Sequence, residues 1–154
     1  MSPNRASRPV ELVSDVIRLE IVLWERIDAC LRERHELPLA FFESLHFISR
    51  TPGGGARVGD LARALRITVG GTSKLVDRIE RVGLIERQPD PDDRRAARLA
   101  LTPIGRRKHS AALKTYETEA AAILDAALSP KEQENMREHI IRLLTEADAG
   151  VVSS

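Results

Sequence analysis

Residues 56–102 decide the fold, and they read ARVGDLARALRITVGGTSKLVDRIERVGLIERQPDPDDRRAARLALT. Apolar residues recur at helical spacing near residues 59–65, which predicts a short first helix. The segment 66–68 interrupts this pattern, and a second helix is predicted over 69–81 with Thr68 as its N-cap. Two short helices joined by a tight turn form a helix-turn-helix, whose second helix can enter the major groove of DNA.

A β-hairpin is predicted directly after the second helix. Gly83 stands where the C-terminus of a helix favours a left-handed residue, and short strands are expected at 84–87 and 98–101. The residues between these strands include two prolines and a run of charges, which is typical of a polar hairpin loop. A helix-turn-helix followed by such a hairpin predicts a winged helix.

The tip of the predicted wing places Asp93 beside Arg94 and Arg95. An arginine at a loop tip fits a narrow, electronegative minor groove of DNA. Asp93 is expected to brace one of these arginines with a bidentate ion pair. The nearby Asp90 and Asp92 also suggest a calcium loop, but the glycine and the distal glutamate of such a loop are absent. A wing tip is therefore the preferred interpretation.

The second helix and its cap are predicted to face the major groove through side chains near the start of the helix. These residues are Thr68, Gly70, Thr72, Ser73, Lys74 and Arg78. Adjacent glycines, Gly70 and Gly71, are unusual in a helix, at a cost of about 1 kcal/mol each relative to alanine. Either the helix backbone approaches DNA closely at these positions, or the positions read no bases.

The run from 58 to 105 resembles the DNA-binding core of the MarR family of bacterial transcription regulators. The matching pieces are DLARAL at 60–65, SKLVDRIERVGLIER at 73–87 and DPDDRRAARLALTPIG at 90–105. The last piece carries the Asp-x-Arg wing signature of the family and the Leu-Thr-x-x-Gly that follows it. The resemblance implies a dimer that represses transcription until a small molecule or an oxidant releases it from DNA.

Charge is distributed unevenly along the chain, although the formal net charge is only +1. Residues 57–108 hold thirteen Lys and Arg against seven Asp and Glu, whereas the rest of the chain holds eleven against sixteen. A basic middle between acidic ends indicates one nucleic-acid face and a separate scaffold.

Amphipathic helices are expected on both sides of the winged helix. Their predicted ranges are 10–34, 39–49, 103–127 and 130–149. A small winged helix cannot cover the apolar faces of the first helix and the last two. We therefore expect these helices to pair with each other and with a second copy, as a two-fold homodimer.

The predicted fold class is mainly α with a small β-hairpin wing. Residues 10–50 and 103–149 form the expected helical dimerisation region, and 51–102 form the winged helix-turn-helix. Residues 1–9 and 150–154 are expected to be flexible tails.

Catalysis is not expected from this sequence. Its four histidines are scattered and no catalytic or metal-binding motif occurs, so neither an enzyme, a cofactor nor a metal site is predicted. A single cysteine, Cys30, excludes an internal disulfide framework and is interpreted as a buried structural residue. No signal peptide or apolar run near 18 residues is present, which predicts a cytoplasmic protein with no membrane partner.

An effector site is implied by the family resemblance. In the family, this pocket lies between the dimer helices and the winged helix and often takes an aromatic acid or a phenol. Candidates here are Trp24, Phe42 and His46, with Arg18 as a carboxylate partner, although Trp24 and Phe42 are equally well explained as core.

The sequence therefore predicts a sequence-specific regulator that binds double-stranded DNA. The most specific form of this prediction is a ligand-responsive repressor on a pseudo-palindromic operator. A redox- or metal-responsive regulator of the same fold stays open as an alternative. A winged-helix module for protein–protein assembly is the alternative from another class.

Overall fold

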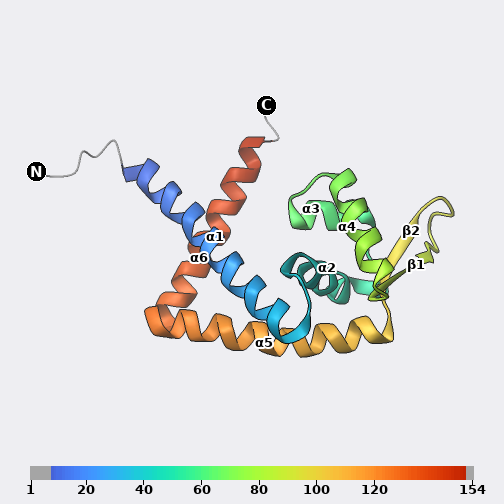
Figure 1. The fold of residues 1–154 in the computed structure, drawn as a ribbon. Coiled ribbons are helices and arrows are strands. Elements are labelled where there is room, and N and C mark those ends of the chain that lie inside the picture. Colours follow the sequence, from blue (N-terminus) through green and yellow to red (C-terminus); the bar gives the residue numbers. More distant parts are fainter. Residues whose placement is uncertain (1–7, 152–154) are drawn as a thin grey trace, which may run out of the picture. The chain divides into compact units, whose positions relative to one another are not determined.

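The computed structural model describes residues 8–151, and helices dominate this part of the chain (Figure 1). The elements in chain order are α1 (Arg8–His35), α2 (Leu39–Arg50), the 3-10 helix η1 (Pro52–Gly54), α3 (Val58–Leu65), α4 (Val69–Arg81), β1 (Ile85–Pro89), β2 (Ala97–Leu101), α5 (Pro103–Ala127) and α6 (Pro130–Val151). The two strands form one antiparallel hairpin. The predicted fold class, a mainly helical chain with a small β-hairpin, is confirmed.

The chain divides into two compact units, Met1–Tyr116 and Glu117–Ser154, and the boundary falls within α5. The first unit holds the helix-turn-helix, the hairpin, α1, α2 and the beginning of α5. The second unit holds the rest of α5 and α6.

Helix α1 begins at Arg8, two residues before its expected start. Pro9 is tolerated there because a helix needs no N–H from a residue in its first turn. The expected tails at 1–9 and 150–154 fall mostly outside the described residues. At the other end, α6 continues as far as Val151.

The turn between α3 and α4 is built from local interactions. Arg66 ends α3 in the left-handed region at φ 58°, a conformation uncommon for residues with a side chain. Thr68 then caps α4, because its Oγ1 accepts a hydrogen bond from the Gly71 N–H at 3.0 Å. Gly83 follows the end of α4 at φ 76°, as predicted. Residues at the helix ends therefore fix where α3 ends and where α4 begins and ends.

The core of the first unit joins α2, α3, α4 and the hairpin. Leu45 of α2, Leu61 of α3 and Ile79 of α4 are fully buried, as is Leu99 of β2. Ala56 adds a short bridge to the hairpin, since its N–H and carbonyl both exchange hydrogen bonds with Leu99, at 3.1 and 2.8 Å. The base of the wing is thus tied by its backbone to the segment that precedes α3.

The hairpin is paired from Ile85 with Leu101 to Pro89 with Ala97. Strand β1 reaches two residues beyond the predicted range of 84–87, so the loop at the tip is shorter than expected. Proline can stand at this last position because it lies at the end of an edge strand.

The first turn of α5 is packed directly against the segment that joins α4 to β1. The Thr102 hydroxyl caps α5, accepting from the Gly105 N–H at 3.0 Å and donating to the Gly83 carbonyl at 2.6 Å. A Cβ at Gly105 would lie 1.9 Å from the Leu84 carbonyl oxygen, so only glycine fits at this position. The Thr102 cap and the close approach of Leu84 thus account for the threonine and the glycine of the Leu-Thr-x-x-Gly run.

Within the second unit, α6 begins with Ser129 and Glu132. The Ser129 hydroxyl and N–H both donate to the Glu132 carboxylate, at 2.7 and 2.8 Å. The hydroxyl, and then the N–H, lower the pKa of this carboxyl. Across the described residues, no helix combines the length and apolar character that crossing a membrane requires.

Candidate nucleic-acid interface

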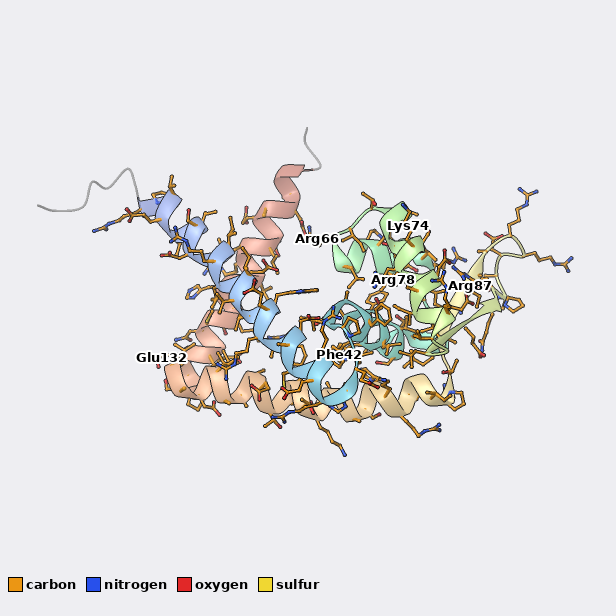
Figure 2. The ribbon with its side chains drawn as sticks, in the orientation of Figure 1. Phe42, Arg66, Lys74, Arg78, Arg87 and Glu132 are labelled. Atoms are coloured by element: carbon orange, nitrogen blue, oxygen red, sulfur yellow. The ribbon has the colours of Figure 1, made fainter. Side chains whose placement is uncertain are left out.

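Helix α4 has one buried face and one exposed face. Its buried residues are Thr72, Leu75, Val76 and Ile79. Residues at positions 70, 74, 77 and 81 lie on the opposite, exposed face, at helical spacing. Lys74 is the cation nearest the start of this face, and it lies on α4 in Figure 2. The structure therefore leaves one full side of α4 open to a partner.

The prediction that Thr72 faces DNA is wrong. Its exposed fraction is 0%, and its hydroxyl donates to the Thr68 carbonyl at 2.8 Å. Thr72 stands three and four residues before Leu75 and Val76, so it shares their inward face. The buried hydroxyl finds its hydrogen-bond acceptor in the preceding turn of the helix.

The other residues predicted on this helix lie at or near its surface. Thr68 is exposed but uses its hydroxyl as the cap of α4, Gly70 is exposed, and Ser73 is half-buried. Arg78 is exposed as well, but its guanidinium lies over the ring of Phe41, 5.4 Å from the ring centroid. Such a contact is worth about 0.5–1 kcal/mol at an exposed site and holds Arg78 toward α2. Base reading by these residues stays a prediction.

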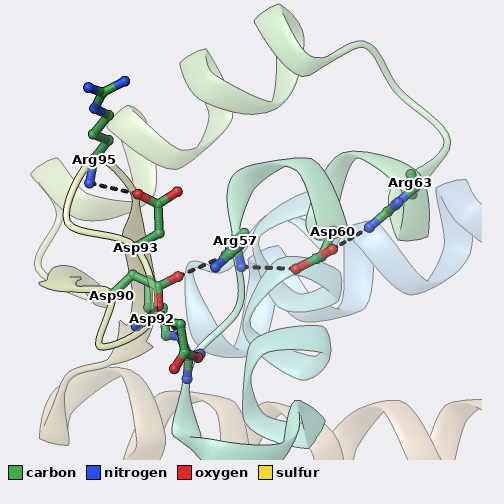
Figure 3. A network of polar contacts seen from close by, with 8 residues as sticks. Arg57, Asp60, Arg63, Asp90, Asp92, Asp93 and Arg95 are labelled. Carbon is green, nitrogen blue, oxygen red and sulfur yellow. Dashed lines mark hydrogen bonds and ion pairs between the residues drawn. The ribbon is translucent and has the colours of Figure 1, made fainter.

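The wing is anchored through one buried carboxylate, that of Asp90 (Figure 3). The Asp90 side chain is 0% exposed and its Oδ2 accepts from Arg57 Nε at 2.8 Å. Its Oδ1 lies 3.3 Å from Arg98 Nε and accepts from the Asp92 N–H at 2.9 Å. A buried charge requires such partners. The Asp92 N–H and the Arg57 guanidinium lower the pKa of the Asp90 carboxyl against the opposing effect of burial.

Only part of this role of Asp90 has a signal in the sequence. An aspartate two residues before Asp92 does favour a side-chain-to-backbone turn, so half of the arrangement had a local signal. The ion pair with Arg57 spans 33 residues of sequence and had none. Asp90 therefore belongs to the base of the wing loop and not to its tip.

Replacement of Asp90 by asparagine should lower the melting temperature by on the order of 5 °C or more at neutral pH. The pKa of the Asp90 carboxyl is lowered in the folded protein, so the ionised carboxylate stabilises the fold at pH values above its ordinary pKa of 3.8. That contribution is lost as the pH falls through the lowered folded pKa. Thermal unfolding of wild type and Asp90→Asn across this range measures the difference, which should shrink in acid.

Asp92→Asn is the matched control for this prediction, because Asp92 is 73% exposed and its N–H stays in place. Equal melting temperatures for wild type and Asp90→Asn at neutral pH would contradict the anchoring role.

Asp93 shapes the wing tip through the backbone. Its Oδ1 accepts from the Arg95 N–H at 2.9 Å, and its carbonyl accepts from the Ala96 N–H at 3.1 Å. The expected bidentate pair between Asp93 and an arginine guanidinium is therefore wrong, because the carboxylate is engaged by the loop itself. Figure 3 shows the Arg95 side chain pointing away from Asp93. Within residues 8–151, Arg94 and Arg95 are exposed and form no ion pair.

The wing and α4 are also joined by Arg87 of β1. Its guanidinium pairs with Asp77, at 2.7 Å, and with Glu80, both on α4. Figure 2 labels Arg87 at the base of the hairpin. The two carboxylates that α4 presents here are thus neutralised from the wing.

Two of the four effector candidates meet, because the rings of Phe42 and His46 are stacked with their centroids 5.6 Å apart. Phe42 is buried and stacks on His109 and Tyr116, with ring centroids 5.5 and 5.1 Å apart. Arg18 is exposed and pairs with Asp15 at 3.2 Å. Trp24 lies exposed on the same helix, α1. Of the two explanations weighed for Phe42, the structure therefore favours core.

His46 is the one candidate that lines an open pocket of about 790 Å³ between α2 and α3. Phe47, Arg50 and Arg63 are among its other lining residues. His46 Nδ1 lies 3.1 Å from Nε2 of His109, a residue that the sequence analysis did not single out. Burial, and then the charge of His46, lower the pKa of His109. No group of three or more potential metal ligands is found among the described residues.

The model of the MarR family matches residues 39–96, from the beginning of α2 to the wing loop. No curated protein matches the chain.

Several solved structures are similar over most of the chain. A probable transcriptional regulator from Pseudomonas aeruginosa is 27% identical with a TM-score of 0.71, over 86% of this chain and 98% of its own. Sco3205, a MarR family transcriptional regulator from Streptomyces coelicolor in complex with DNA, is 23% identical with a TM-score of 0.81, over 95% and 91%. CouR from Rhodococcus jostii RHA1, bound to p-coumaroyl-CoA, is 20% identical with a TM-score of 0.73, over 81% and 85%.

The winged helix that carries an exposed α4 face and two unpaired wing arginines is also the part that matches the family model. The similar structures extend this agreement to the fold of the flanking helices. Residues 39–96 match the MarR family of transcriptional regulators, and the described chain has the fold of MarR family regulators of known structure.

Proposed function

We propose that this protein is a ligand-responsive repressor that binds a pseudo-palindromic DNA operator as a homodimer. DNA binding is supported by basic side chains that are exposed and are not neutralised by a carboxylate of the protein. Lys74 on the open face of α4 and Arg94 and Arg95 at the wing tip are exposed and form no ion pair within residues 8–151. Other arginines of the winged helix, such as Arg57 and Arg87, form ion pairs with carboxylates of the protein itself.

The positions of these basic side chains suggest that α4 and the wing contact different grooves of DNA. Helix α4 has the dimensions that fit a major groove, and Lys74 would reach the edge of a guanine from there. A wing-tip arginine fits the adjacent minor groove, where width and potential vary with sequence. Both elements lie in one compact unit and are joined by Arg87, so they would dock together.

The homodimer is supported by apolar side chains that the single chain leaves exposed. On α1 and α6 they include Val13, Val16, Ile17, Ile21, Ile140, Ile141, Leu143 and Leu144. On each of these helices by itself, a row of exposed apolar side chains of this extent marks an interaction site. A two-fold dimer would cover it and would present two copies of α4 to two half-sites one helical turn apart.

The effector is supported by the pocket that includes His46 and by the similar structure bound to p-coumaroyl-CoA. The proposed mechanism is a shift of the spacing between the two α4 helices, since a displacement of a few ångströms misplaces one of them. For this, the effector must bind the form that does not fit DNA more tightly.

Selection from duplexes with a randomised centre tests the proposal. Wild-type protein should enrich a two-fold sequence, a gel shift should confirm binding, and salicylate added to the complex should weaken it. Failure to enrich any sequence would instead favour a winged-helix module for protein–protein assembly.

Lys74→Ala should lower the affinity for the selected duplex by about 1–3 kcal/mol, concentrated at one position of each half-site, because a side chain that reads a base discriminates at that base. Gel shifts on duplexes with single base changes measure this. Lys131→Ala, which removes the same charge from the exposed start of α6, is the matched control. Equal losses for the two variants would show that Lys74 acts only through its charge.

A further inference from the structure

Gly70 occupies the outermost position in the first turn of α4. The buried residues Thr72, Val76 and Ile79 define the inner face, and Gly70 lies opposite to them, in line with Lys74. A Cβ built at Gly70 meets no atom within 4 Å, and the backbone there is not in the left-handed region. The fold of the described chain therefore gives no reason for glycine at this position.

The neighbouring glycine is different. A Cβ at Gly71 would lie 3.1 Å from Thr68 Oγ1, the atom that caps α4. That contact is tight and explains why a side chain is disfavoured at 71. At Gly70, by contrast, glycine only weakens the helix, because alanine is the better helix former. A side chain at position 70 would therefore cost the fold nothing.

We propose that Gly70 determines how closely α4 approaches the base edges of the major groove. This inference rests on the proposed function, in which α4 lies in that groove. With no side chain at the outermost position, the backbone can come nearer to the bases than an alanine or larger residue allows. The flanking side chains then gain reach into the groove.

The residues beside Gly70 indicate what would be read. Val69 is 60% exposed although it is apolar, and its methyl groups suit the C5-methyl group of thymine. Lys74, one turn further along, suits the O6 and N7 acceptors of guanine. Gly70 is therefore assigned as a specificity-determining position: a thymine and a guanine are read by its neighbours because it carries no side chain.

The chain offers a matched control in Gly59. Gly59 is the second residue of α3, after Val58, just as Gly70 is the second residue of α4, after Val69. Both glycines are exposed, and a Cβ at either meets no atom within 4 Å. Alanine at 59 should therefore have the same effect on helix stability without changing the exposed face of α4.

The experiment compares wild type, Gly70→Ala and Gly59→Ala in thermal unfolding and in binding to the duplex that wild type selects from the randomised pool. Both variants should melt at or above the wild-type temperature. Gly70→Ala should bind about tenfold or more weakly, and Gly59→Ala within about twofold of wild type. A repeated selection with Gly70→Ala should lose the thymine or guanine preference.

Gly70→Ala with wild-type affinity and the same selected sequence would overturn the inference while leaving the proposed function intact. Equal losses in Gly70→Ala and Gly59→Ala would overturn it as well. If wild type selects no duplex, the proposed function itself fails, and this inference fails with it. Because the melting temperatures are measured on the same samples, unfolding cannot be mistaken for lost binding.

Discussion

Replacing Ile140 and Leu143 of α6 by aspartate will convert the protein to monomers and lower its affinity for operator DNA by on the order of a hundredfold or more. Both side chains are exposed in the single chain, at 44% and 60%, so the chain alone has no core to lose there. In the proposed dimer the same carboxylates would be buried without partners, which strongly opposes assembly. Each α4 would then bind its half-site without the benefit of the other.

Light scattering measures the first effect and a gel shift the second, while circular dichroism should show that helix content is retained. Arg142→Asp is the control, because it changes the net charge by the same amount on the opposite face of α6. A double variant that stays dimeric, or a wild type that is a well-folded monomer at micromolar concentration, would rule out this interface.

Removing both wing arginines, as Arg94→Ala with Arg95→Ala, should weaken DNA binding by on the order of a hundredfold, across many sequences and not at one base pair. The minor groove distinguishes mainly A·T from G·C, so the loss carries at most an A·T-linked change in preference. The plot of log affinity against log salt should become shallower by roughly two units, one for each lost cation near the backbone. Titrations at several salt concentrations measure both quantities.

Asp93→Ala refines this test. Simple electrostatics predicts tighter binding when a carboxylate near DNA is removed. The turn that Asp93 makes with the Arg95 N–H predicts weaker binding, because the arginine then loses its position. Glu86→Ala removes one charge from β1 without touching the tip, and serves as the control. If Asp93→Ala and Glu86→Ala both tighten binding, Asp93 is merely a solvated charge.

Much of the fold could be predicted because its signals are local. Thr68 and Thr102 cap their helices by accepting from the N–H three residues on, the Glu132 carboxylate accepts from Ser129 over the same distance, and Gly83 needs only its own φ angle. Hydrophobic spacing placed the ends of most helices to within about two residues. Short-range chemistry of this kind is legible in a single sequence.

The predictions that fail concern side chains whose partners are distant in sequence, or for which several groups could serve as the partner. Asp90 could not be assigned to Arg57 from sequence, since the pairing depends on how the wing folds back toward α3. For Asp93 the expected partner is a guanidinium, but its carboxylate accepts from the backbone N–H of Arg95 instead, which is closer along the chain. Thr72 is predicted to face outward from its place near the start of α4, although its spacing from Leu75 and Val76 already puts it on the inner face.

The contact between Gly105 and Leu84 has a mechanical consequence. The Leu84 carbonyl oxygen lies where a Cβ of residue 105 would be, and it also accepts the Thr102 N–H at 3.1 Å. Atoms packed this closely cannot slide past one another, because interiors at this density transmit displacement instead of absorbing it. Rotation of the first turn of α5 would therefore carry the end of α4 with it, and the joint between these helices behaves as a rigid coupling and not as a hinge.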